Sequence, residues 1–328
     1  MRTADSIDPQ HAPRESETRT PAVSALDKGP RWVFAVPPAL VVLGLLRGVR
    51  IEYLGAALLI AVLAAVGPRS RRFAALALPF AAVGVIYDHF DLVSGLRAGI
   101  HVGDLFRAEL MVFGVPLDGV RVVPATWLGA HTHWLLDLAC GFSYLAYLYE
   151  VFIVGAWLYL RRDEPRMSTL AWGFLLVNLI GMFVWLIFPA APPWYVAQYG
   201  AGPAQLDALP SAAGAARFDE LLGIHYFAEF YARSRNVFGA MPSLHVAYPT
   251  LVFLVLRERG RVAAALALSF ALLVAFSAIY LGHHYVLDAL GGALAALLAY
   301  AVARYAVYRR HGAPPANSPI ASPHEGAA

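Results

Sequence analysis

Long apolar stretches alternate with short, arginine-rich gaps along most of the chain. A helix that crosses a bilayer needs about 20 consecutive apolar residues, and several stretches reach or approach this length. The apolar stretches are residues 32–47, 51–67, 73–92, 136–160, 168–188, 243–256, 262–282 and 285–308. The pattern therefore predicts an all-α fold, a polytopic helical bundle in a membrane.

The number of crossings stays open between six and eight. The stretches long enough to cross alone are 136–160, 168–188, 262–282 and 285–308. The first stretch is short and carries Pro37 and Pro38. The first two stretches can therefore form either two crossings or a hairpin that crosses only in part.

Both ends of the chain lack apolar periodicity. Residues 1–30 mix proline, serine, threonine and charges, and residues 312–328 are rich in proline and alanine. Segments of this composition bury too little apolar surface to fold. We therefore expect two disordered tails around one membrane catalytic domain at residues 31–311.

The arginines in the gaps predict the orientation of the helices. With a cytoplasmic N-terminus and eight crossings, four basic segments fall on the cytoplasmic side, as insertion favours. These segments are 69–72, 161–166, 257–261 and 309–310. Arg47 and Arg50 are exceptions to this pattern. The long loops 93–135 and 189–242 then face outward, and loops of this length tend to carry function.

Composition agrees with a membrane protein. Of 328 residues, 59% are hydrophobic and 14% are charged, against about 25% charged in an average soluble domain. The net charge is +3, but the scattered arginines do not form a stripe that binds nucleic acid. Cys140 is the single cysteine, which excludes a disulfide framework. One lysine and many alanines point to a GC-rich genome, so we expect a bacterial plasma membrane.

The first polar cluster opens the sixth apolar stretch. Pro242 suits the first turn of a helix, and the free N–H groups of a helix start favour phosphate. Ser243 adds a hydroxyl, and His245 lies one turn inside, where it can give or take a proton. Arg233 and Arg235 lie upstream and supply positive charge suited to phosphate oxygens.

The second polar cluster opens the eighth stretch. His284 and Asp288 are four residues apart, so on a helix they share one face. The carboxylate can hold one ring nitrogen as a donor and leave the other as a nucleophile. His283 lies off that face and is the weaker candidate. Because alternate helices start on the same side, both clusters can meet at one membrane surface.

The same side chains allow other interpretations. A lone histidine in a membrane helix can simply pack, although ionisable groups there are usually functional. A metal site of His245, His284 and Asp288 ranks lower, because the chain has no HExxH or comparable spacing. Two imidazoles, one carboxylate and a helix start on one face favour catalysis.

Three further acidic residues lie in or beside the apolar stretches. Asp88 ends the third stretch, where a cap at the membrane surface and a head-group contact are equally compatible with the sequence. Asp137 and Glu150 lie in the fourth stretch, and their roles stay open between packing and function.

The two histidine motifs resemble the second and third signatures of the type 2 phosphatidic acid phosphatase superfamily. Gly-Ala-Met-Pro-Ser-Leu-His ending at His245, and His-His-Tyr-x-x-Asp ending at Asp288, are most similar to the inositol phosphorylceramide synthase (aureobasidin-resistance) branch. Weaker similarities lie at 107–114, 124–128 and 188–195. The resemblance covers most of residues 85–295 and implies a phosphatidic acid phosphatase-like helical core.

The resemblance also implies a phosphohistidine mechanism without a metal or other cofactor. His284 would attack the lipid phosphorus while Asp288 orients and charge-balances it. His245 would protonate the leaving oxygen and then activate the acceptor. The partners would be a phospholipid donor and a lipid or sugar hydroxyl, or water. The branch favours transfer of an inositol phosphate-type head group at the outer membrane face. The alternative is hydrolysis of phosphatidic acid or polyprenyl phosphates.

The sequence departs from the superfamily pattern in its arginines. The arginine expected six positions before the nucleophilic histidine is Ala278, and a Lys-x6-Arg-Pro signature is absent. Arg233 and Arg235, and then Arg107, are therefore our candidates for holding the phosphate.

Two non-enzyme classes compete with this interpretation. A membrane transporter would use Asp88, Asp137 and Glu150 as a proton relay. It does not explain the two histidine motifs, and the sequence has no inverted repeat. A scaffold subunit predicts no chemistry at all.

Overall fold

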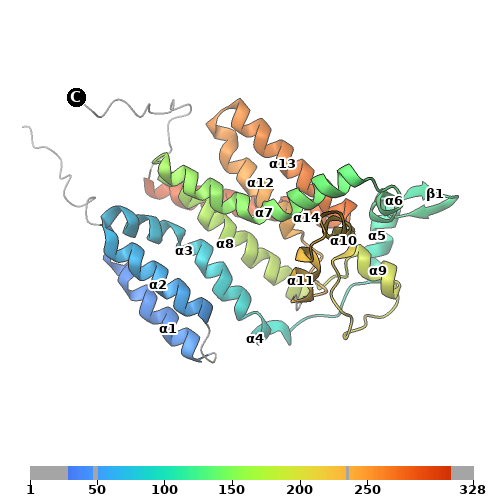
Figure 1. Cartoon of the computed structure of the whole chain (residues 1–328), viewed down its shortest axis with the longest axis horizontal. Helices are drawn as coiled ribbons and strands as arrows, with labels where there is room; N and C mark the ends of the chain where they lie inside the picture. Colours follow the sequence, from blue (N-terminus) through green and yellow to red (C-terminus); the bar gives the residue numbers. More distant parts are fainter. Residues whose placement is uncertain (1–28, 47–50, 234–235, 312–328) are drawn as a thin grey trace, which may run out of the picture. The chain divides into compact units, whose positions relative to one another are not determined.

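The computed structural model describes residues 29–46, 51–233 and 236–311. The described chain is helical apart from one short hairpin, which confirms the predicted all-α class (Figure 1). Contacts divide the chain into one unit up to Ala75 and a second unit from Leu76 onward. The two tails expected at the ends lie, apart from residues 29 and 30, outside the described residues.

The first unit is a short helical hairpin. The 3-10 helix η2 (Arg31–Ala35) leads into α1 (Val36–Leu46), which packs against α2 (Ile51–Val66). Both α-helices are shorter than the roughly 20 residues that a crossing needs. The first part of α3 (Pro68–Asp88) completes this unit. These lengths agree with the hairpin alternative for the first two apolar stretches.

Five described helices are long and apolar enough to cross a membrane. They are α3, α7 (Trp134–Leu160), α8 (Glu164–Ile187), α13 (Arg261–Tyr280) and α14 (Val286–His311). Among them are all four of the stretches predicted to cross alone. The protein is thus a multi-pass membrane protein, and the predicted polytopic bundle is confirmed.

The shorter helix α12 (Leu244–Leu256) lies at the centre of the second unit. It packs against α7, α8, α13 and α14, and most of its side chains are buried. A helix that is apolar all round is typical of such a buried position. The 3-10 helix η4 (Arg257–Arg259) and then Gly260 end it. The centre of the bundle is therefore built around the helix that carries His245.

The two long loops fold into short elements. The loop from 93 to 135 begins within α4 (Asp91–Ser94). The elements within it are α5 (Gly103–Phe113), β1 (Val115–Leu117), β2 (Val120–Val122) and α6 (Pro124–Ala130). Those of the other loop are α9 (Pro193–Tyr199), η3 (Ala213–Ala215), α10 (Ala216–Leu222) and α11 (Tyr226–Ala232). β1 and β2 pair antiparallel, with Val115 opposite Val122. Figure 1 shows these elements gathered at the end of the bundle where α14 begins.

Candidate active site

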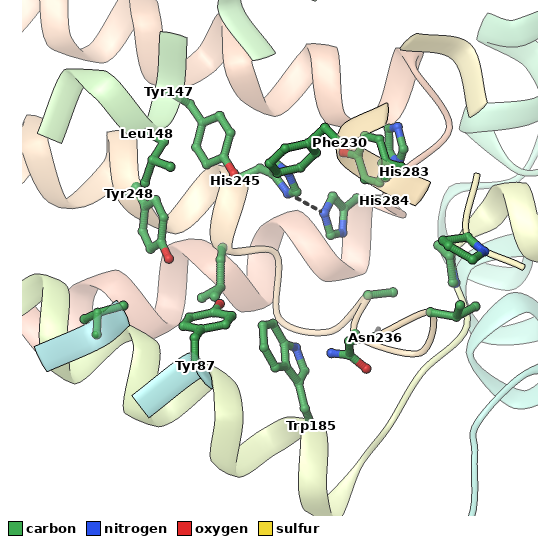
Figure 2. A pocket seen from close by; sticks show the side chains of 18 of the residues that line it. Tyr87, Tyr147, Leu148, Trp185, Phe230, Asn236, His245, Tyr248, His283 and His284 are labelled. Carbon is green, nitrogen blue, oxygen red and sulfur yellow. Dashed lines mark hydrogen bonds between the residues drawn. The ribbon is translucent and has the colours of Figure 1, made fainter. Parts of the chain in front are cut away.

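The starts of α12 and α14 meet backbone to backbone. The Ser243 amide donates to the Asp288 carbonyl at 3.0 Å. A Cβ atom added to Gly292 would lie 2.2 Å from the Ser243 carbonyl oxygen, so only glycine allows this approach. The contact brings His245 and His284 together, and Nδ1 of His245 lies 2.9 Å from Nε2 of His284 (Figure 2).

The turn before α14 is fixed by its own backbone. Gly282 has φ +74°, the left-handed region that favours glycine. The amides of His283 and His284 then both donate to the Ala278 carbonyl, at 3.1 and 3.0 Å. Ala278 itself is fully buried in an apolar cluster that includes Cys140. The position where the superfamily carries an arginine is thus filled by close apolar packing.

Asp288 supports His284 from the first turn of α14. Its Oδ2 lies 3.6 Å from Nδ1 of His284 and accepts a hydrogen bond from the Tyr285 amide at 2.8 Å. In the described part of the chain, Nδ1 of His284 and Oδ1 of Asp288 are buried without a hydrogen-bond partner. Catalytic hydrogen bonds are often long before substrate binds. The pair is therefore placed for a short contact that has not yet closed.

His283 occupies an aromatic column beside this pair. It stacks between Tyr231 and Tyr144, at centroid distances of 4.5 and 5.3 Å, and Tyr144 also stacks on His245 at 4.3 Å. Nε2 of His283 donates to the Ala212 carbonyl at 3.0 Å. Burial lowers the pKa of His283 to about 3, so its ring is neutral near pH 7. Its contacts join the start of α14 to α7 and to the loop around α11.

A cavity of about 470 Å³ opens beside the two facing histidines. Its aromatic lining comprises Phe80, Tyr87, Tyr147, Phe152, Phe174, Trp185, Trp194, Phe230, Tyr231 and Tyr248. Figure 2 shows Tyr87, Tyr248 and Trp185 on the side of the cavity away from His283. The volume is in the usual range for a small-molecule site. An aromatic cavity that ends at two imidazoles suits an amphiphile with its polar group at the histidines.

The two helix starts differ in their capacity to bind an anion. At α12, the amides of Leu244 and His245 find no hydrogen-bond acceptor in the described part of the chain, and both residues line the cavity. At α14, the amides of Val286 and Leu287 donate to Glu109 at 2.8 and 3.1 Å. Free amides at a helix start bind phosphate readily. Of these two helix starts, α12 offers them.

Ser243 is the N-cap of α12. It is fully buried, and its Oγ accepts from the Val246 amide at 3.4 Å. It does not line the cavity. The helix begins at Leu244, so Pro242 precedes the cap, and the expectation that it occupies the first turn is wrong.

The remaining predicted binding residues lie away from the cavity lining. Arg233 is 82% exposed and pairs with Glu229 at 3.6 Å. Arg107 is exposed on α5, and Asp88 ends α3. None of these side chains lines the cavity. Arg235 lies outside the described residues.

Two polar pairings were not predicted from the sequence. Arg97 donates from Nη2 to Oδ1 of Asn236 at 2.9 Å, and Asn236 lines the cavity. Arg217 donates to Asp137 at 2.6 Å, and Tyr280 donates to the same oxygen at 2.9 Å. Asp137 therefore joins α7, α10 and α13. Asp137 stands out as a charge inside an apolar stretch, but nothing in the sequence pairs it with Arg217.

Glu150 and the metal alternative can also be compared with the structure. Oε2 of Glu150 is buried without a hydrogen-bond partner in the described chain, and Glu150 does not line the cavity. Within residues 29–46, 51–233 and 236–311, no group of three or more histidine, cysteine or acidic side chains is arranged to hold a metal ion.

Comparison with known proteins identifies the family. The sequence pattern of the PAP2 superfamily matches residues 119–302, more than half of the chain. The chain belongs to the PAP2 superfamily. No solved structure matches it significantly.

Its curated relatives include bacterial and fungal synthases. The chain is 37% identical over 270 residues to the phosphoinositol dihydroceramide synthase of Bacteroides thetaiotaomicron, covering 81% of this chain and 88% of the relative. It is 30% identical over 213 residues to the inositol phosphorylceramide synthase catalytic subunit of Saccharomyces cerevisiae, covering 65% and 51%. For the Candida albicans inositol phosphorylceramide synthase, the identity is 29% over 209 residues, covering 64% and 43%. The chain thus spans about half of each fungal relative.

These comparisons confirm two predictions. The motifs at His245 and Asp288 lie inside the matched region, so the resemblance to the superfamily is confirmed. The relatives are phosphotransferases, and the expectation that this protein is a membrane enzyme of that type is confirmed as well.

Proposed function

We propose that the protein transfers a phosphorylated head group from a phospholipid to a lipid hydroxyl through a phosphohistidine at His284. The observation that carries this proposal is the 2.9 Å contact between His245 and His284 at a largely aromatic cavity. The names of the relatives support an inositol phosphate-type head group and a ceramide-type acceptor.

The neighbours of the two imidazole rings determine which of the ring nitrogens carries hydrogen. A carboxylate only accepts hydrogen bonds, so Asp288 favours the tautomer of His284 that carries hydrogen on Nδ1. Nε2 of His284 then has a free lone pair, and Nδ1 of His245 donates to it before substrate binds. The donor phosphate takes the place of this hydrogen bond.

The reaction then proceeds in two displacements. Nε2 of His284 forms a bond to phosphorus while the bond from phosphorus to the departing lipid oxygen breaks. Protonated His245 gives its Nδ1 proton to that oxygen. In the second half, Nδ1 of His245 takes the proton of the acceptor hydroxyl, whose oxygen attacks phosphorus and releases His284.

The start of α12 supplies the charge stabilisation that the absent arginine provides elsewhere. The amides of Leu244 and His245 have no acceptor in the described chain, and both residues line the cavity. Preorganised N–H donors stabilise charge that builds up on phosphoryl oxygens during transfer. Asn236, which Arg97 holds by its carbonyl oxygen, adds an amide group to the same cavity.

We place the reaction at the extracytoplasmic face of a bacterial plasma membrane. His245 lies at one end of α12, and Arg257 and Arg259 lie beyond the other end. Arginine between spans is retained on the cytoplasmic side. The composition favours a GC-rich bacterium as the source.

The test uses purified protein in detergent with phosphatidylinositol labelled in the head group, with and without ceramide. Wild-type protein is expected to form labelled inositol phosphorylceramide, and His284→Ala and His245→Ala are expected to form none. The exposed His131 serves as the matched control, and His131→Ala keeps full activity.

An acid-labile phosphoprotein that is lost in His284→Ala identifies the nucleophile. Release of labelled inositol phosphate to water at the same rate in the presence of ceramide would indicate hydrolysis of the donor phospholipid instead of transfer. Full activity of both His245→Ala and His284→Ala would refute the proposed function.

A further inference from the structure

Glu109 is a buried carboxylate far from the histidine motifs in sequence. It lies in α5, has no exposed surface, and accepts from two consecutive amides at the start of α14. Its Oε1 lies 2.8 Å from the Val286 nitrogen, and its Oε2 lies 3.1 Å from the Leu287 nitrogen. Both oxygens therefore accept hydrogen bonds from the helix that begins two residues after His284.

Together with Glu109, five consecutive backbone amides, those of residues 283–287, have hydrogen-bond acceptors. The amides of residues 283 and 284 donate to the Ala278 carbonyl, and the Tyr285 amide donates to Asp288. The next two amides donate to Glu109. Every backbone N–H from 283 to 287 thus has an acceptor, and His284 lies within this run. Glu109 links this run by hydrogen bonds to the loop that contains α5.

The same contact determines which helix start is open to phosphate. A carboxylate at a helix start interacts favourably with the helix dipole and uses its free amides. With Glu109 in place, the first amides of α14 are occupied, while those of Leu244 and His245, two residues that line the cavity, have no acceptor in the described chain. Phosphate is thereby directed to α12, across from Nε2 of His284.

We propose that Glu109 is a positioning residue, which fixes the start of α14 so that His284 faces a phosphate held at the start of α12. The kinetic part of this inference rests on the proposed function. The anchoring of the two amides does not depend on it. Glu109 acts through the backbone and does not touch substrate.

Asp219 provides a matched control for the experiment. It is also buried, and it accepts from two consecutive amides, those of Phe227 and Ala228, at 3.2 and 3.0 Å. It anchors α11, a helix that contributes Phe230 and Tyr231 to the cavity lining but carries no reacting histidine. Glu109→Gln and Asp219→Asn therefore remove equivalent carboxylates from two different helix starts.

Hydrogen exchange and steady-state kinetics are measured on detergent-purified full-length variants. Glu109→Gln is expected to speed exchange in the peptide spanning 284–288. It is also expected to lower kcat on the order of 10- to 100-fold with little change in KM, since small misplacements of reacting groups have effects of this size. Asp219→Asn is expected to speed exchange at 226–229 and to leave kcat within about twofold.

Three results would overturn the proposal. One is an equal loss of kcat in the two variants, and another is a Glu109→Gln effect confined to KM. The third is unchanged exchange at 284–288. If Glu109→Gln does not fold, Glu109→Asp keeps the charge with a shorter reach, and wild-type kcat in it counts against the proposal. If wild-type protein transfers no head group, the proposed function fails, while exchange alone still decides whether Glu109 holds the start of α14.

Discussion

At the scale of single residues, the proposed reacting groups and the residue that holds their helix come from distant parts of the chain. His284 and Asp288 are four apart, and helix geometry alone places them on one face. His245 follows from its place just inside a helix start. Glu109 contacts α14 from 177 residues away, and no local pattern encodes a contact of that separation. Of the arginines proposed to bind phosphate, Arg233 and Arg107 are exposed and lie outside the cavity lining, and their role stays a prediction.

The variant Asp288→Asn separates two roles of this carboxylate: accepting a hydrogen bond at the start of α14 and orienting His284. The amide oxygen still accepts from the Tyr285 amide, so the helix start is kept. The side chain no longer holds the hydrogen on Nδ1 of His284, and loss of such a carboxylate beside a catalytic histidine costs on the order of 10⁴-fold in kcat. We expect a loss of this order, with a matching decrease in the rate of phosphoenzyme formation. A kcat within twofold of wild type would show that Asp288 has no part in the chemistry.

His283 is expected to make the stability of the folded protein depend on pH. Because burial lowers the pKa of His283 to about 3, the folded state binds fewer protons than the unfolded state between about pH 6.5 and 3. The stabilisation that comes from the neutral His283 ring is therefore fully present above pH 6.5, and it is lost as the pH falls through this window. Thermal unfolding in detergent should show a shallower decrease in Tm between pH 6.5 and 4.5 for His283→Gln than for wild type. An identical slope would mean that His283 is not buried as a neutral ring.

At the scale of elements, hydrophobic patterning predicted helices and missed the loops. Each of the eight apolar stretches contains a helix. A helix needs an apolar surface both where it is buried in the protein and where it contacts lipid, so the pattern predicts it in both environments. The elements α5, α9 and α11 are short and mixed in composition, so their sequences carry no clear period. They are held by tertiary contacts, such as Asp219 at the start of α11. The packing of α12 on α14 likewise depends on one glycine that the pattern does not distinguish.

Gly292→Ala tests that packing. The added methyl group would meet a backbone carbonyl at 2.2 Å, which cannot rotate away. Overpacking of this kind costs about 1–3 kcal/mol, and it separates His245 from His284. We expect a lower Tm together with a large loss of activity.

Gly291→Ala is the matched control for that variant. Its methyl group would meet the flexible Met241 side chain at 2.7 Å, which can move aside. The control should keep most of the activity. Equal behaviour of the two variants would contradict a backbone contact at Gly292.

At the scale of the whole second unit, the proposed catalytic histidine and a group of arginines lie at opposite ends of α12. Asp163 lies at the arginine end and accepts from Arg166 at 2.8 Å and from Arg259 at 2.7 Å. Thirteen residues of α12 extend about 20 Å at 1.5 Å per residue, less than the roughly 30 Å of a hydrocarbon core. In the proposed orientation, with its arginine end at the cytoplasmic surface, α12 would therefore place His245 below the outer surface of the membrane.

The orientation of the second unit can be measured by cysteine labelling in intact cells. Cys140 is buried, so Cys140→Ala provides a cysteine-free background. A cysteine at Asp207, exposed in the loop before α10, should react with a membrane-impermeant maleimide, because that loop lies at the histidine end. A cysteine at Arg161, exposed between α7 and α8, should react only after the cells are permeabilised. The reverse pattern would place the histidines on the cytoplasmic side, and the lipid donor and acceptor would then have to come from the inner leaflet.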